Sequence, residues 1–106
     1  MPSLDFAVNQ TAPTAGNGAS KSLVAAISGS AIFLVQVVIE STNTTTDNVI
    51  FQDGSGGTTL LNVQLPINTT LVLPCTGAWW ARTTIGNGLF FNTTANTVVT
   101  AYYLVR

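Results

Sequence analysis

The apolar residues of this chain fall in short runs with the character of β-strands. Runs rich in Val, Ile, Thr and aromatic residues are separated at short intervals by clusters of Gly, Pro, Asn and Asp. The pattern predicts an all-β, single-domain antiparallel β-sandwich of jelly-roll-like form, with eight or nine short strands. The expected strands are 5–9, 22–27, 31–40, 48–53, 58–65, 69–73, 79–84, 89–92 and 97–105.

The strand pattern weakens toward the N-terminus. The stretch 12–18 is made of small and turn-forming residues, which predicts a flexible arm or loop. We therefore divide the chain into an N-terminal arm, 1–20, and a β-sandwich domain, 21–106. Segment 22–27 could also begin a helix, which Gly29 would stop within two turns. Further along, 86–88 is a tight-turn sequence, so we expect 79–84 and 89–92 to pair as a hairpin.

Strand 31–40 is the most apolar segment, and it is apolar on both faces. Strict alternation places Phe33, Val35, Val37 and Ile39 on one face and Ile32, Leu34 and Val38 on the other. A strand with one wet face would instead alternate apolar and polar residues. Both faces of this strand must therefore be covered, one by the core and one by another surface.

The largest side chains come in doublets: Trp79-Trp80, Phe90-Phe91 and Tyr102-Tyr103. Neighbouring side chains on a strand point to opposite faces, so each doublet should send one ring inward and one outward. Three large outward rings would be exposed to water in a monomer, whereas an assembly of subunits can bury them. The candidate interface residues are Ile32, Leu34, Val38, Trp79, Trp80, Phe90, Tyr102 and Tyr103.

Charge is scarce in this chain. Charged residues make up 7% of it and the formal net charge is −1, whereas an ordinary soluble domain is about 25% charged. We expect no binding to nucleic acid and none to membranes, because no basic patch, polybasic segment or long apolar span is present. The first residues do not resemble a signal peptide, so we expect synthesis in a host cytoplasm.

The residues of common catalytic sites are missing. The chain has no His, which removes the commonest general base and metal ligand. Asp47 and Asp53 stand at opposite ends of one strand, about 20 Å apart, too far for a glycosidase pair, which needs about 10 Å or less. We therefore expect no enzyme activity, no catalytic residues and no cofactor. A calcium ion bound near Asp47 or Asp53 remains an alternative, and Cys75, the single cysteine, is expected to be a small buried side chain.

The order of several turn and strand motifs resembles that of a known group of proteins. The motifs are Ile27–Ile32, Val49–Gly54, Leu65–Asn68 leading into Leu71–Pro74, an aromatic residue at Trp79 or Trp80, Thr84–Leu89 with Asn92, and the last strand, Val98–Val105. From about Leu23 to the end, the chain is similar to small all-β structural proteins of tailed bacteriophages. The resemblance implies a virion component, often a capsid decoration (cement) protein, and carries over no catalytic residue.

Two functions therefore follow from the sequence. The first is a non-enzymatic capsid decoration protein on the virion surface, which forms a homo-oligomer, expected to be a trimer, and binds the major capsid protein. The second is a receptor- or glycan-binding module of a phage tail. Its site would combine the outward Trp with loops 42–48 and 53–57.

Overall fold

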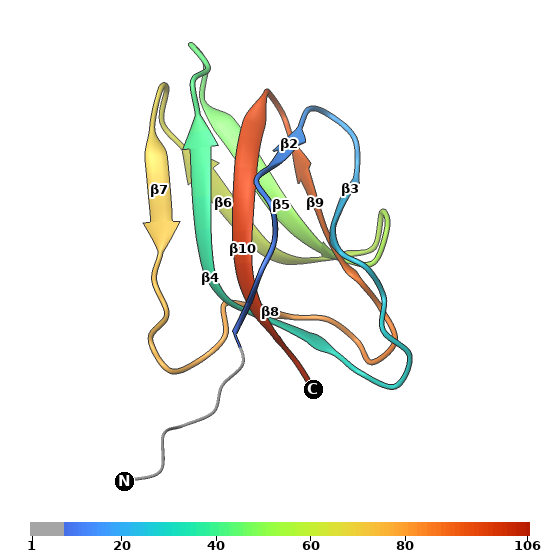
Figure 1. The fold of residues 1–106 in the computed structure, drawn as a ribbon. Helices are drawn as coiled ribbons and strands as arrows, with labels where there is room; N and C mark the ends of the chain where they lie inside the picture. The colour runs from blue at the N-terminus through green and yellow to red at the C-terminus, as the bar shows by residue number, and fades with distance from the viewer. Residues whose placement is uncertain (1–7) are drawn as a thin grey trace, which may run out of the picture.

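The computed structural model describes residues 8–106, which form two antiparallel sheets packed face to face (Figure 1). The described residues contain strands and no helix, so the predicted all-β sandwich is confirmed. The strands are β1 Asn9–Gln10, β2 Thr14–Gly16, β3 Lys21–Val24, β4 Ile32–Ser41, β5 Asp47–Asp53, β6 Thr58–Leu65, β7 Thr70–Leu73, β8 Ala81–Arg82, β9 Leu89–Thr93 and β10 Thr97–Val105.

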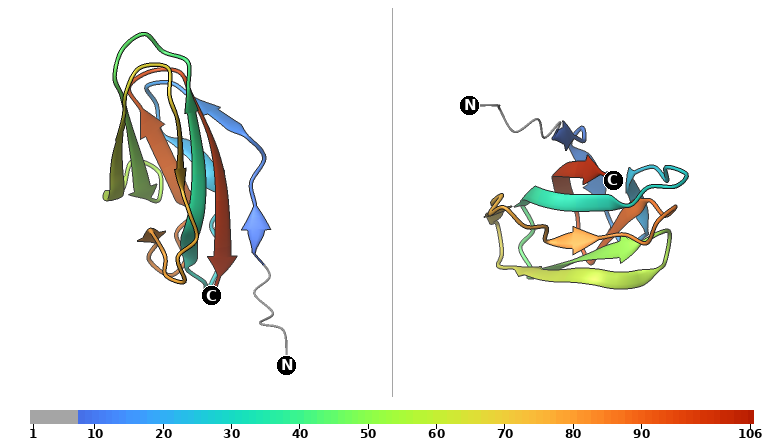
Figure 2. Two further views of the ribbon diagram at one scale, coloured as in Figure 1. Left: turned by 90° about the vertical axis from the view of Figure 1, so that its left-hand side faces the viewer. Right: turned by 90° about the horizontal axis from the view of Figure 1, so that it is seen from below.

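The two sheets have different strand orders. Sheet A runs β1-β10-β4-β7, with β2 also paired to β10 and β8 also paired to β4. Sheet B runs β3-β9-β5-β6. The edge-on views in Figure 2 show the two layers with the chain crossing between them. The core fills the space between the layers, and its largest fully buried side chains include Phe51, Phe91, Ile39 and Leu65.

A β-bulge in β4 overturns the strict alternation predicted for this strand. Tyr102 of β10 pairs with Gln36, but Tyr103 pairs with Leu34, so Val35 is an extra residue on β4. An extra residue shifts the side-chain alternation by one position. Ile32 and Leu34 consequently join Val37 and Ile39 in the core, all fully buried. The prediction that Ile32 and Leu34 face outward as interface residues is therefore wrong.

The segment predicted to be a flexible arm is part of sheet A wherever it is described. β1 pairs with β10 through Asn9 and Gln10, and β2 pairs with β10 over 14–16. Gly16 is buried, and a Cβ atom at this position would stand 2.5 Å from the ring of Phe91. The described part of 1–20 is thus held to the sandwich. The remainder of the arm, and most of the strand expected at 5–9, lie outside the described residues.

The hairpin predicted around 86–88 does not form. β8 pairs with β4 in sheet A, whereas β9 pairs with β3 and β5 in sheet B. The connection crosses from one sheet to the other, and Thr83 anchors it. The Thr83 hydroxyl accepts a hydrogen bond from the Ile32 backbone N–H at 2.9 Å and donates one to the Asn87 carbonyl at 3.1 Å. A turn sequence alone does not reveal which sheet receives the following strand.

Candidate functional site

The outer face of sheet A carries a row of neighbouring, partly exposed apolar side chains. Val38 of β4 pairs with Val72 of β7, and Phe33 of β4 pairs with Leu104 of β10. Val72 is 49% exposed, and the other three side chains are partly exposed. Neighbouring apolar side chains on an outer sheet face bury little area in the isolated chain, so they are available for contact with another surface.

The outer face of sheet B has a different chemistry. Asn48 pairs with Gln64, and Ile50 lies between Asn62 and Asn92 on the two neighbouring strands. Amide side chains can hydrogen-bond with water without carrying charge. Ile50 and Phe90 are the partly exposed apolar side chains among these amides, so the outer face of sheet B is more polar than that of sheet A.

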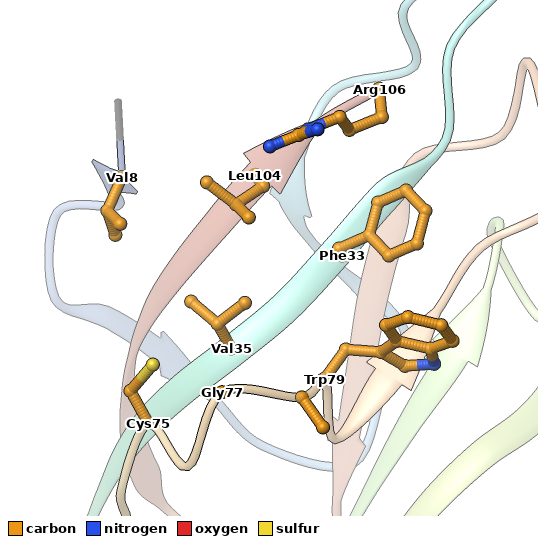
Figure 3. A pocket seen from close by; sticks show the side chains of 9 residues that line it. Val8, Phe33, Val35, Cys75, Gly77, Trp79, Leu104 and Arg106 are labelled. Atoms are coloured by element: carbon orange, nitrogen blue, oxygen red, sulfur yellow. The ribbon is translucent and has the colours of Figure 1, made fainter. Parts of the chain in front are cut away.

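An apolar groove of about 340 Å³ opens on the sheet A side, at the end where the described chain begins and ends (Figure 3). Its floor is formed by outward side chains of β4 and β10, and one wall is the loop that follows β7. The lining residues are Val8, Phe33, Val35, Cys75, Gly77, Ala78, Trp79, Leu104 and Arg106. Such a groove suits an apolar side chain or a short peptide segment of a partner.

Phe33 and Trp79 form the aromatic centre of the groove. Their ring centroids lie 5.1 Å apart at an interplanar angle of 76°, an edge-to-face arrangement. The guanidinium carbon of Arg82 lies 5.6 Å from the centroid of the Phe33 ring, a cation–π contact. Phe33 is therefore held between two neighbours, while Trp79 remains 54% exposed and presents much of its indole to the outside.

The loop from Pro74 to Trp80 is fixed at both ends, so the groove wall is built into the fold. The Trp80 backbone N–H donates to the Leu34 carbonyl at 2.7 Å, and its indole Nε1 donates to the Pro74 carbonyl at 2.9 Å. The Cys75 backbone N–H donates to the Gln36 side-chain oxygen at 3.4 Å. Trp80 thus anchors the loop, and Trp79 is left pointing outward.

Each aromatic doublet has one inward and one outward ring, but Trp79 and Trp80 lie in the loop before β8 and not on the strand expected at 79–84, so strand alternation does not explain that doublet. Trp80 and Tyr103 pack against the core and Phe91 is fully buried, whereas Trp79, Phe90 and Tyr102 lie outside it. Trp79 and Tyr102 lie on the sheet A side, but Phe90 pairs with Gln52 on the outer face of sheet B. The three outward rings therefore do not form one surface, and Phe90 is separated from the groove.

The structure adds site residues that the sequence analysis did not select. Phe33, Val72, Leu104 and Val8 belong to the sheet A surface or the groove. Phe33 was not selected because the side-chain alternation of β4 was counted without its bulge. Cys75 is exposed in the groove wall, so its predicted burial is wrong: the residue follows Pro74 at the strand end and enters the loop instead of the core.

Asp47 and Asp53 are tied to loops by hydrogen bonds. Asp53 accepts bonds from the backbone and hydroxyl of Thr84 and from the Asn87 amide at 3.1 Å. Burial raises the pKa of Asp53. The hydrogen bonds from Thr84 and Asn87 together lower it by more than burial raises it, so the pKa lies below its ordinary value. Asp47 accepts bonds from Asn43, Thr94 and the backbone N–H of Ala95.

These contacts describe carboxylates that fasten loops to the sandwich. Within residues 8–106, no group of three or more His, Cys, Asp or Glu side chains gathers in a metal-binding arrangement. Residues 8–106 also contain no helix with the length and hydropathy needed to cross a bilayer.

Comparison with known proteins adds no relative: no family model, no curated protein and no solved structure matches the chain.

Proposed function

We propose that this chain is a non-enzymatic structural subunit of a bacteriophage particle, acting as a capsid decoration protein on the virion surface. The observation that carries the proposal is the apolar outer face of sheet A with its groove. There, Trp79 is 54% exposed beside Phe33 and Leu104. The resemblance of the motif order to tailed-phage structural proteins supports the phage setting.

In this proposal the outer face of sheet A binds a neighbouring copy of the chain, in a homo-oligomer that we propose to be a trimer. Obligate interfaces are more apolar than ordinary protein surface and are poor in charge at their centre. Val38, Val72 and Trp79 supply the apolar area, and a chain with 7% charged residues brings little like-charge repulsion when many copies lie together. The assembled subunit would then bind the major capsid protein.

The absence of His from the sequence supports a non-enzymatic role. The two strand-end carboxylates, Asp47 and Asp53, accept hydrogen bonds from neighbouring loops and so serve structural contacts. They stand at the two ends of β5, so they do not share a site.

A glycan- or receptor-binding role in a phage tail is the second candidate, and the exposed Trp79 beside Arg82 and Phe33 favours it. An exposed indole can stack on a sugar ring. The loops 42–48 and 53–57 expected to complete such a site lie at opposite ends of β5 and β6, however, so they cannot both adjoin Trp79. The groove would have to bind the sugar alone, and its lining is largely apolar.

Quantitative mass spectrometry of purified particles of the encoding virus tests the proposal. A decoration protein should be present in a fixed ratio near that of the major capsid protein. A tail-tip module would be present in only a few copies per particle, which would favour the second candidate. Absence of the chain from washed particles would contradict both.

A further inference from the structure

The four sheet edges of the sandwich differ in how well they are protected against pairing with another chain. A sheet edge exposes unpaired backbone N–H and C=O groups, and natural proteins protect edges with short strands, Pro, Lys or bulges. The β1/β2 edge consists of two short strands with Pro13 between them. The β7/β8 edge is also made of short strands, and Pro74 lies between them. β3 is short, carries Lys21 and has a bulge.

The β6 edge lacks most of this protection. β6 is eight residues long and contains no Pro and no charged residue. Among the described strands it pairs only with β5, so its other edge is open. Its one irregularity is a bulge at Leu60, which leaves Leu61–Leu65 as regular strand. No Asp, Glu, Lys, Arg or His occurs anywhere between Asp53 and Arg82.

We propose that the open edge of β6 pairs antiparallel with β6 of a second copy, across a two-fold axis at Val63. An antiparallel pair about a two-fold axis brings each strand against itself, so each copy supplies the donors and acceptors that the other needs. A different protein would need its own matching free edge. An identical partner is compatible with this edge, because an uncharged strand placed against its own copy meets no like-charge repulsion.

The register with Val63 on the axis also matches the exposed side chains. It sets Asn62 of each copy opposite Gln64 of the other, and both residues are exposed on the outer face of sheet B. Each amide can donate and accept hydrogen bonds, so two amide pairs would form across the axis. On the inner face, Leu61 would lie opposite Leu65 of the second copy and continue the apolar layer.

This contact uses the edge of sheet B, so it does not depend on the groove in sheet A. Charge variants at the two exposed positions test both the pairing and its register. Asn62→Lys with Gln64→Lys sets Lys opposite Lys twice, and we expect the solution mass from light scattering to fall to half that of the wild type. Asn62→Lys with Gln64→Glu sets Lys opposite Glu twice, and we expect it to keep the wild-type mass.

Asn92→Lys is the matched control, because it adds a charge to the same sheet face on the interior strand β9. It should keep the wild-type mass, and equal circular dichroism spectra would show that all variants are folded. A wild-type monomer, or a Lys/Lys variant with unchanged mass, would overturn the pairing. Dissociation of the Lys/Glu variant would overturn the register. If Trp79→Ala leaves the mass unchanged while the Lys/Lys variant halves it, the sheet A contact fails and the β6 contact stands.

Discussion

The ring of Phe91 lies against the backbone of Gly16, so close that a Cβ atom on Gly16 would stand 2.5 Å from its Cε2 atom. Phe91 is fully buried at the centre of sheet B, and Gly16 ends β2 on the edge of sheet A. This contact closes one side of the sandwich and makes residues 14–16 part of the core structure. The described part of the segment that looks like a loose arm in the sequence is therefore packed into the fold.

Gly16→Ala should destabilise the protein by about 1–3 kcal/mol, the usual cost of adding a methyl group to a packed core. Urea unfolding measures the change. Phe91→Leu shortens the opposing side chain, so Gly16→Ala should cost less in a Phe91→Leu background than in the wild type. Ala15→Ser, at the exposed neighbouring position, serves as the control and should be close to neutral. An equal cost of Gly16→Ala in both backgrounds would contradict the contact.

The two tryptophans should respond oppositely to substitution. Trp79→Ala should lower the free energy of unfolding by less than about 1 kcal/mol, yet reduce self-association, because the indole is 54% exposed in the groove. Trp80→Ala should cost roughly 2 kcal/mol or more, since it removes core packing and the hydrogen bond to Pro74. Thermal unfolding and light scattering on both variants check the pair. If neither variant loses self-association, the sheet A interface is contradicted.

The bulge in β4 separates residues that strict alternation places on one face. Leu34→Ala should destabilise the fold by about 2–5 kcal/mol, the range for large core truncations, because Leu34 is fully buried. Val38→Ala should have a much smaller effect on unfolding and should act on self-association instead, because Val38 is partly exposed beside Val72. Denaturant midpoints for the two variants measure this difference. Similar losses of stability would contradict the bulge.

Protonation of Asp53 should lower the free energy of unfolding at acidic pH. Its pKa is lower in the folded chain than the unfolded value of about 3.9, so its contribution is complete above that pH and is lost as the pH falls through the folded pKa. Asp53→Asn should therefore flatten the decline of the urea midpoint between neutral pH and pH 3. Glu40→Gln, at an exposed position on β4, is the matched control and should keep the wild-type profile. An unchanged profile in Asp53→Asn would contradict the role of Thr84 and Asn87.

The strand pattern could be read from the sequence because period-two alternation and turn residues are local signals. β6 and β10 have the bounds predicted for 58–65 and 97–105. The bulge at Val35 could not be predicted, because no Gly or other special residue marks it and it depends on how β4 pairs with β10. The crossing between β8 and β9 escaped prediction for a related reason: a Gly-Asn-Gly turn suits both a hairpin and a connection between sheets.

The candidate site was predictable only in part. The aromatic doublets indicated that one ring of each pair would face out, but the outward choice of Trp79 depends on the hydrogen bonds that hold Trp80 to Leu34 and Pro74. Phe33 joined the site only through the bulge, and Val8 only because β1 adds to the edge of β10. These are long-range relationships, and nothing in the neighbouring sequence encodes them.

The solution mass of the purified chain, measured by size exclusion with light scattering, tests the central claim most directly. The proposed trimer through sheet A has three subunits, and two such trimers joined through all three β6 edges would have six. A mass of 11.1 kDa, that of a single chain, at every concentration tested would contradict the account. The groove and the β6 edge would then be surfaces that the chain does not use to bind itself.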